Sequence, residues 1–386
     1  MSRKRMVATA AMLAGALMLT ACGSSPTGSG GGAALKIGFM GDLTGENSGI
    51  VIPPRNGAKL AVDEYNATNP ETPIELVVYD SQGNPDQAVP LTQQAVQQDQ
   101  IVGMIGPAFS GESKAVGPIL EQAKIPSVSA SATNPGLAQN GWVYWHRIVA
   151  NDNDQGPGIA EFLIRAESPD NAFVISDDQE YSVGLADAVA QDFEAKGVTV
   201  ERDQFAQAAS DYSSTISKVT AANPGVVVYG GYYAQAGRLL KQLRDAGVTA
   251  VFASGDGSLD PGIISGAGAS AAEGAVLACP CNIPFGATTG PLAEFSERYR
   301  AAFDTDPAIY ATEGYDAATL FVDAVKAGNT TPDAINTYIS GAMLDGVSKK
   351  IAFKPNGEPD VNAIFIYQVK DGSLTLLGPS TEATLG

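Results

Sequence analysis

Residues 225–247, GVVVYGGYYAQAGRLLKQLRDAG, join a run of apolar, β-branched residues to a helix-length segment through a Gly-Gly turn. A short apolar strand followed directly by an amphipathic helix is the repeating unit of a parallel sheet that carries helices on its faces. The unit recurs along most of the chain, so the sequence predicts an α/β fold.

The same alternation extends from this stretch in both directions. Strand-like runs occur before and after the polar segment ANDNDQGP at 150–157, which predicts two similar lobes. Residues 291–342 are predicted to be mostly helical, and 363–378 to form two antiparallel strands around Asp371-Gly372. Ligands of such sheets bind outside the carboxyl ends of the strands, so the loops there are the candidate site. The predicted strands are 35–40, 74–80, 101–106, 125–130, 142–149, 171–177, 198–205, 225–231 and 250–255.

The charge of the chain excludes some partners. Its 386 residues carry a formal net charge of −19 at pH 7, without a basic stripe that could bind phosphates. We therefore expect no nucleic-acid partner. An anionic membrane surface would also repel the acidic body of the protein.

The first residues predict export. Basic residues at 3–5 precede an apolar run at 6–21, which suits a signal peptide and is shorter than the about 20 residues that span a membrane. The stretch LTACGSS resembles a bacterial lipobox, so 1–21 is interpreted as a signal peptide and Cys22 as the lipidated first residue. A plain secretory signal is the alternative. Residues 22–34 would be a flexible Gly/Ser-rich tether to the membrane.

Two further cysteines, Cys279 and Cys281, lie in LACPCN. A Cys-x-Cys pair with one His in the chain cannot supply a four-ligand zinc site. Their spacing suits a disulfide poorly, so we expect buried thiols or a redox-inert pair.

The motifs of common enzymes are missing from the sequence. There is no Gly-x-Ser-x-Gly elbow, and the single His146 lies in a strand-like run, where packing is the expected role. GAGASA at 266–271 lacks a preceding apolar strand. NDNDQGPGIAE resembles a calcium loop, but Glu161 falls one position short, and Asp154 is interpreted as a helix N-cap. We expect no enzyme activity, cofactor or metal.

Three hydroxyl side chains follow neighbouring predicted strands. Ser110 follows one strand and begins a helix, and Ser131 and Thr133 follow the next strand in SVSASATNPG. Because parallel neighbours end at the same edge, the three hydroxyls can converge on one small anion near a helix N-terminus. The alternative is that each is a cap or turn residue.

Two further residues lie at the corresponding edge of the second lobe. Tyr232 and Asp256 follow adjacent predicted strands in VYGGYYAQ and ASGDGSL. An acid there would complement an ammonium group, and a solvated Asp-Gly turn is the alternative reading.

Four segments carry a family resemblance that spans about 36–378: SASATNPGL, DNDQGP, YGGYYAQAGRLLKQLRDAG and SGDG. Together they resemble the leucine/isoleucine/valine-binding proteins of ABC transporters, in the type I periplasmic-binding family. The resemblance implies two Rossmann-like lobes, joined by three crossovers, that close on one amino acid.

The resemblance also implies roles for individual residues. Ser110, Ser131 and Thr133 occupy the positions that hold the ligand carboxylate, and Tyr232 and Asp256 those that hold its ammonium group. Two further tyrosines match aromatic positions of the side-chain pocket: Tyr181 and Tyr310.

The chain departs from the family at several positions. Ile50 stands where many relatives have a pocket tyrosine, and Asp256 stands where Glu is common. A disulfide of the enteric members is absent, because its positions fall on Gly83 and Phe109. The first two departures leave the ligand open, since relatives also bind other amino acids, amides and urea.

The family organisation predicts lobe 1 from 35–149 with about 282–349, and lobe 2 from 150–281 with about 350–386. The predicted function is that of a monomeric, extracytoplasmic lipoprotein that delivers a small aliphatic amino acid to ABC permease subunits in the membrane. A ligand-sensing receptor or an amide/urea-binding protein of the same fold is the alternative, and a secreted hydrolase is a remote one.

Overall fold

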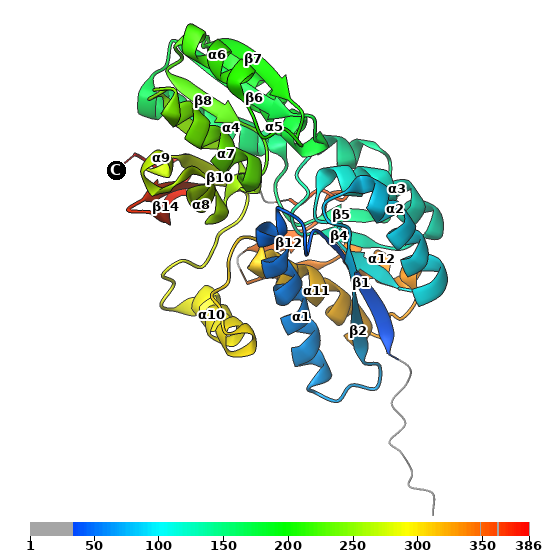
Figure 1. Ribbon diagram of the computed structural model, residues 1–386. Helices are drawn as coiled ribbons and strands as arrows, with labels where there is room; N and C mark the ends of the chain where they lie inside the picture. Colours follow the sequence, from blue (N-terminus) through cyan, green and yellow to red (C-terminus); the bar gives the residue numbers. More distant parts are fainter. Residues whose placement is uncertain (1–33, 348, 361–362, 386) are drawn as a thin grey trace, which may run out of the picture.

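The computed structural model describes residues 34–347, 349–360 and 363–385. The predicted signal peptide and Cys22 lie outside these residues. Two sheets, each flanked by helices, form two lobes side by side (Figure 1). Within the described residues, no helix is long and apolar enough to cross a membrane.

Sheet A has five parallel strands in the order β2-β1-β3-β4-β5. Sheet B has seven strands in the order β14-β13-β10-β9-β8-β6-β7, and a small hairpin pairs β11 with β12. The strands are β1 (Leu35–Gly41), β2 (Ile74–Asp80), β3 (Gly103–Ile105), β4 (Ser127–Ser129), β5 (Trp145–Arg147), β6 (Asn171–Asp177), β7 (Thr199–Phe205), β8 (Val226–Tyr229), β9 (Val251–Ser254), β10 (Val276–Cys279), β11 (Met343–Asp345), β12 (Lys350–Ala352), β13 (Phe365–Lys370) and β14 (Ser373–Pro379).

The helices connect the strands as the alternation predicted, and the block at 291–342 is mostly helical, as expected. They are α1 (Ile52–Asn66), α2 (Pro85–Gln94), α3 (Ser110–Ala123), α4 (Asp152–Glu167), α5 (Glu180–Ala195), α6 (Ser213–Ala222), α7 (Tyr233–Asp245), α8 (Gly262–Ala267), α9 (Ala269–Ala272), α10 (Gly290–Phe303), α11 (Ala311–Lys326) and α12 (Pro332–Ser340).

Sheet A is covered on both faces, and its interior strand β1 is apolar on both of them. Along β1, Ile37 and Phe39 pack in one cluster with residues of α1 and α11, whereas Met40 packs in another with residues of α2 and α3. Successive side chains of a strand point to opposite faces, so both helix layers find an apolar partner. This packing fixes the direction of the strands and hence the edge at which their loops meet.

Sheet B is mixed, with parallel strands β7, β6, β8, β9 and β10 and an antiparallel pair at one edge. The tail forms the predicted hairpin around Asp371-Gly372, with Asp371 at φ 50° and Gly372 at φ 71°. Its strand β13 pairs antiparallel with β10. The end of the chain therefore completes the second lobe.

The chain crosses between the two lobes at three places in the described residues: between β5 and α4, between β10 and α10, and between β12 and β13. The helices α10 to α12 thus return to the lobe of sheet A, where α11 packs on α1 (Figure 1). The fold is the expected α/β architecture with a three-crossover hinge.

His146 has the packing role that the sequence predicted. Its imidazole on β5 is 3% exposed, lies edge-on to Phe353, and places Nε2 3.0 Å from Ser340 Oγ. Burial lowers the pKa of His146 to about 4, so the ring is neutral at physiological pH.

Candidate ligand-binding site

The loops at the carboxyl ends of the two sheets enclose a cavity between the lobes. Six of the seven predicted ligand-contacting residues line it: Ser110, Ser131, Tyr181, Tyr232, Asp256 and Tyr310. Ile50, Ala108 and Phe109 complete the lining. With a volume of about 10 Å³, the cavity holds about one water molecule in this conformation.

The serine hydroxyls form the lobe 1 wall of the cavity. Ser110 is the first residue of α3, and its Oγ accepts a hydrogen bond from Asn134 N at 3.2 Å. Its hydroxyl proton therefore stays available for an anionic ligand. Ser131 Oγ instead donates to Ala108 O at 2.8 Å, so it must rotate before it can donate to a ligand.

Thr133 is the predicted residue that does not line the cavity. Its side chain is fully buried, and its Oγ1 makes no well-aligned hydrogen bond within the described residues, although it lies close enough to the Asp152 carboxyl to lower the pKa of that group. A buried hydroxyl without a well-aligned partner is costly, which makes it a group that an entering polar ligand could satisfy.

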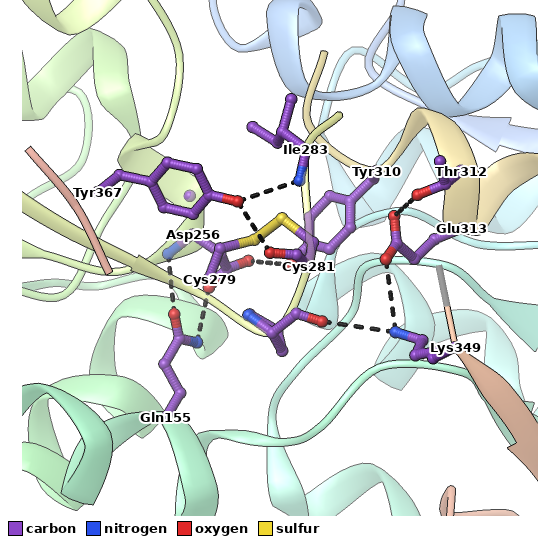
Figure 2. Close-up of a disulfide and its surroundings, with 12 residues drawn as sticks. Gln155, Asp256, Cys279, Cys281, Ile283, Tyr310, Thr312, Glu313, Lys349 and Tyr367 are labelled. Atoms are coloured by element: carbon purple, nitrogen blue, oxygen red, sulfur yellow. Dashed lines mark hydrogen bonds and ion pairs between the residues drawn. A yellow bond between two sulfur atoms is a disulfide. The ribbon is translucent and has the colours of Figure 1, made fainter. Parts of the chain in front are cut away.

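The lobe 2 wall is centred on Asp256, which is 4% exposed and follows β9. Its Oδ1 accepts hydrogen bonds from Gln155 Nε2 at 2.7 Å and Tyr181 OH at 2.8 Å, and its Oδ2 accepts one from Tyr310 OH at 2.6 Å (Figure 2 shows Gln155 and Tyr310 beside it). A carboxylate offers about four acceptor positions, so about one remains on Oδ2. The carboxylate is held in place and still able to accept a proton donor of a ligand.

Tyr310 lies in the lobe of sheet A, and its side chain contacts the Asp256 carboxylate of the other lobe. It precedes α11 and adopts left-handed backbone dihedrals, with φ 60° and ψ 6°, which are uncommon for a residue other than glycine. The hydrogen bond from its phenol to Asp256 joins the lobes in this conformation. An unfavourable backbone conformation kept at a site that links two lobes points to a functional role.

Three aromatic rings pack together beside these polar groups. Tyr232 lies 4.6 Å from Phe109 and 5.0 Å from Tyr181 between ring centroids. Phe109 was predicted only as one position of a missing disulfide. Its ring lies where a side chain at Gly83 would have to fit, since a Cβ there would be 2.9 Å from Phe109 Cε2.

Comparison with known proteins identifies the family to which the chain belongs. A family model described as periplasmic binding protein matches residues 34–373. The chain belongs to the periplasmic binding protein family.

Several relatives of this binding protein are named for the amino acids leucine, isoleucine and valine. It is 28% identical over 352 residues to the leucine-specific-binding protein of Salmonella typhimurium, covering 89% of this chain and 85% of the relative. It is 29% identical over 351 residues to the Leu/Ile/Val-binding protein of Escherichia coli, covering 90% and 86%. The crystal structure of a leucine binding protein from Thermotoga maritima is similar with a TM-score of 0.83 and 27% identity, covering 90% of this chain and 98% of that one.

A second buried carboxylate in the binding protein was missed by the sequence reasoning. Asp152 is fully buried at the start of α4, and Gln155 Nε2 donates to its Oδ1 at 3.0 Å as well as to Asp256. Its segment DNDQGP was interpreted as a helix start with Asp154 as the cap. That is wrong, because Asn151 is the cap and its side chain accepts from Asn153 N, whereas Asp154 lies in the first turn.

The expectation of free thiols in the binding protein is also wrong. Cys279 and Cys281 form a disulfide with an S–S distance of 2.00 Å at the second crossover (Figure 2). Cys279 is the last residue of β10, and the chain turns directly after it. The turn brings the Cα atoms of Cys279 and Cys281 to 5.0 Å from each other, closer than they would be in an extended strand. Tyr367 OH fixes the end of this segment, because it accepts a hydrogen bond from Ile283 N and donates one to Cys281 O.

A buried ion pair fixes the other two crossovers of the binding protein. Arg147 is fully buried, and its Nε donates to Glu358 Oε2 at 2.8 Å, while Nη2 also binds Glu358 Oε1. Arg147 Nη1 donates to the carbonyls of Ala132 and Asn134 at 3.0 and 2.9 Å. The same guanidinium thus holds the hinge and the loop that carries Ser131.

The burial of Asp152 predicts a pH dependence of stability. Burial, followed by the nearby charge of Asp256, raises the pKa of Asp152 to about 8, while the Thr133 hydroxyl, Arg147 and Gln155 lower it. Between pH 4 and 8 the native state then keeps a proton that the unfolded chain has lost, so the free energy of unfolding falls as the pH rises through this range.

We expect Asp152→Asn to make this decline shallower by up to about 1.4 kcal/mol per pH unit, the value for one proton. Urea unfolding of wild type and variant at several pH values between 5 and 8 measures the difference. Glu112, whose pKa burial raises to about 7, is present in both proteins and does not contribute to that difference. Parallel pH curves for the two proteins would rule out this titration of Asp152.

Proposed function

We propose that this periplasmic binding protein binds a small aliphatic α-amino acid between its lobes and delivers it to the membrane subunits of an ABC importer. The observation that carries the proposal is the opposed polarity of the cavity: serine hydroxyls on the lobe 1 side and the Asp256 carboxylate on the lobe 2 side. The names of the relatives support an amino-acid ligand.

The proposed binding mode uses both charged ends of the ligand. Ser110, Ser131 and Thr133 would hold the α-carboxylate, Asp256 and Tyr232 the α-ammonium group, and two tyrosines the side chain: Tyr181 and Tyr310. Both charged ends of the ligand are bound only when the two lobes close around it, so the ligand shifts the protein toward its closed form. In the closed, dry site each charge-assisted hydrogen bond is stronger than in water.

The proposed lobe boundaries follow the sequence reasoning: 35–149 with about 282–349, and 150–281 with about 350–386. The crossovers near 148–151 and 280–289 support the first two boundaries, whereas the third crossover follows β12 (Lys350–Ala352) and lies a few residues after the proposed boundary at 349.

Membrane anchoring through a lipid on Cys22 is also part of the proposal, supported by the lipobox-like LTACGSS. If the proposal is correct, Cys22→Ser moves the protein out of the membrane fraction, and retention at the wild-type level refutes it.

The hydroxyl wall is tested by two variants. Ser110→Ala and Thr133→Val should each weaken amino-acid binding by about 1–3 kcal/mol, the cost of losing a hydrogen bond to a charged group. Thr133→Val should change the melting temperature without ligand only slightly, because the hydroxyl that it removes makes no well-aligned hydrogen bond in the described residues and otherwise only lowers the pKa of Asp152. Calorimetric titration with L-leucine, L-isoleucine and L-valine measures the affinities. Unchanged affinities for both variants would show that these two side chains serve the turns and do not bind the ligand.

A further inference from the structure

A larger chamber lies next to the cavity, at the mouth of the cleft between the lobes. Its volume of about 380 Å³ is within the range of small-molecule sites. Phe109 and Tyr232 line both the cavity and the chamber, so the two spaces adjoin at this tilted pair of rings. An extended ligand held in the cavity would enter the chamber beside these two rings.

The walls of the chamber are rich in hydrogen-bonding groups. Lobe 1 contributes loops after β1 and β2, and lobe 2 contributes the loop after β7, the start of α5 and the first turns of α7. Four glutamines line it: Gln82, Gln179, Gln207 and Gln235. The charged groups in its lining are Asp42, Glu46 and Arg238.

Two polar atoms of α7 are left without partners at this wall. Gln235 is 1% exposed and donates from Nε2 to Glu46 Oε2 at 3.5 Å and to Gln207 O at 3.4 Å, yet its Oε1 has no hydrogen-bond partner among the described residues. Arg238 pairs through Nη2 with Glu46 at 3.2 Å and also interacts with the Tyr212 phenol, while its buried Nε makes no well-aligned hydrogen bond in this part of the chain. Gln235 Oε1 is thus an acceptor without a donor, and Arg238 Nε is a donor without a well-aligned acceptor.

The hydrogen-bonding capacity of Gln235 Oε1 and Arg238 Nε favours some ligand groups in the chamber over others. A carboxamide or ureido group both donates and accepts, so it can satisfy Gln235 Oε1 and Arg238 Nε together. A carboxylate cannot donate to Gln235 and would be repelled by Glu46 and Asp42. An aliphatic group would leave both atoms unpaired, which costs free energy.

We propose that this chamber is a second subsite that binds the carboxamide or ureido end of an amino-acid ligand through Gln235 and Arg238. The inference rests on the proposed amino-acid function and extends its ligand class from aliphatic amino acids to longer ones with a terminal amide.

The first test uses the wild-type full chain and four probes in calorimetric titrations: L-glutamine, L-glutamate, L-norleucine and L-leucine. L-Glutamine should bind about tenfold or more tightly than L-glutamate and L-norleucine, because only its side chain satisfies both atoms. Binding of L-leucine without binding of L-glutamine refutes the subsite and leaves the proposed function intact. Binding of no α-amino acid at all refutes both.

The second test uses Gln235→Leu, with Gln191→Leu on the exposed side of α5 as the matched control. Gln235→Leu should lower the ratio of L-glutamine affinity to L-leucine affinity about tenfold, and the control should leave that ratio within twofold. An unchanged ratio in Gln235→Leu overturns the proposal, because Gln235 would then act on closure or packing and not on the ligand.

Discussion

Asp256→Asn is expected to weaken amino-acid binding by at least about 2–4 kcal/mol, or roughly 30- to 1000-fold, because a buried ammonium group would lose its counter-charge. The variant keeps the shape of the side chain: its Oδ1 can still accept from Gln155 and Tyr181, and its Nδ2 can donate to the phenol oxygen of Tyr310. Burial raises the pKa of the Asp256 carboxyl, so its charge is unfavourable in the empty site. The melting temperature without ligand should therefore stay the same or rise.

This combination of lower affinity and maintained stability distinguishes a ligand contact from a structural one. Asp170→Asn, at an exposed position just before β6, is the matched control and should change neither quantity. Calorimetry with aliphatic amino acids measures the affinity, and thermal unfolding without ligand measures the stability. Equal affinities for wild type and Asp256→Asn would show that Asp256 does not bind the ammonium group of the ligand.

Arg147→Met is expected to lower the free energy of unfolding by about 3–5 kcal/mol, because it leaves the buried Glu358 carboxylate without its counter-charge. The carbonyls of Ala132 and Asn134 lose their donor as well. The midpoint of urea unfolding measures the loss.

Two comparisons sharpen this test. Arg202→Met breaks an ion pair with Asp187 in which both side chains are nearly half exposed, and it should cost no more than about 1 kcal/mol. The double variant Arg147→Met with Glu358→Leu should recover much of the loss, because it buries no unpaired charge. A loss for Arg147→Met as small as that for Arg202→Met would contradict a structural role of the pair at the hinge.

The sequence predicted the fold because its signals are local. Strands such as 225–231 are short apolar runs followed by helical patterns, and parallel sheets covered on both faces produce that pattern wherever they occur. The position of a residue just after such a strand then predicts that it lies at the ligand edge. This reasoning placed Ser110 and Asp256 at opposite walls of one cavity.

What the sequence missed depends on contacts between distant segments. Glu358 lies 211 residues from Arg147, and nothing in either neighbourhood marks them as partners. Asp152 looks like an ordinary helix-start acid until the fold buries it beside Gln155 and Asp256. The Cys279–Cys281 disulfide was missed for a local reason, since the chain turns at the end of β10 and the prediction assumed an extended strand.

In the proposed binding mode, the cleft recognises both charged ends of an aliphatic α-amino acid. Calorimetric titration of the wild-type protein with L-leucine, with its deamino acid and with L-leucine amide tests it most directly. We predict that L-leucine or another aliphatic α-amino acid binds, and that each analogue lacking one charged end binds roughly 30-fold more weakly or worse. The deamino acid leaves the Asp256 charge unpaired, and the amide loses the charge-assisted hydrogen bonds to the hydroxyls of lobe 1. Binding of simple amides or urea in the absence of binding by any α-amino acid would contradict this binding mode.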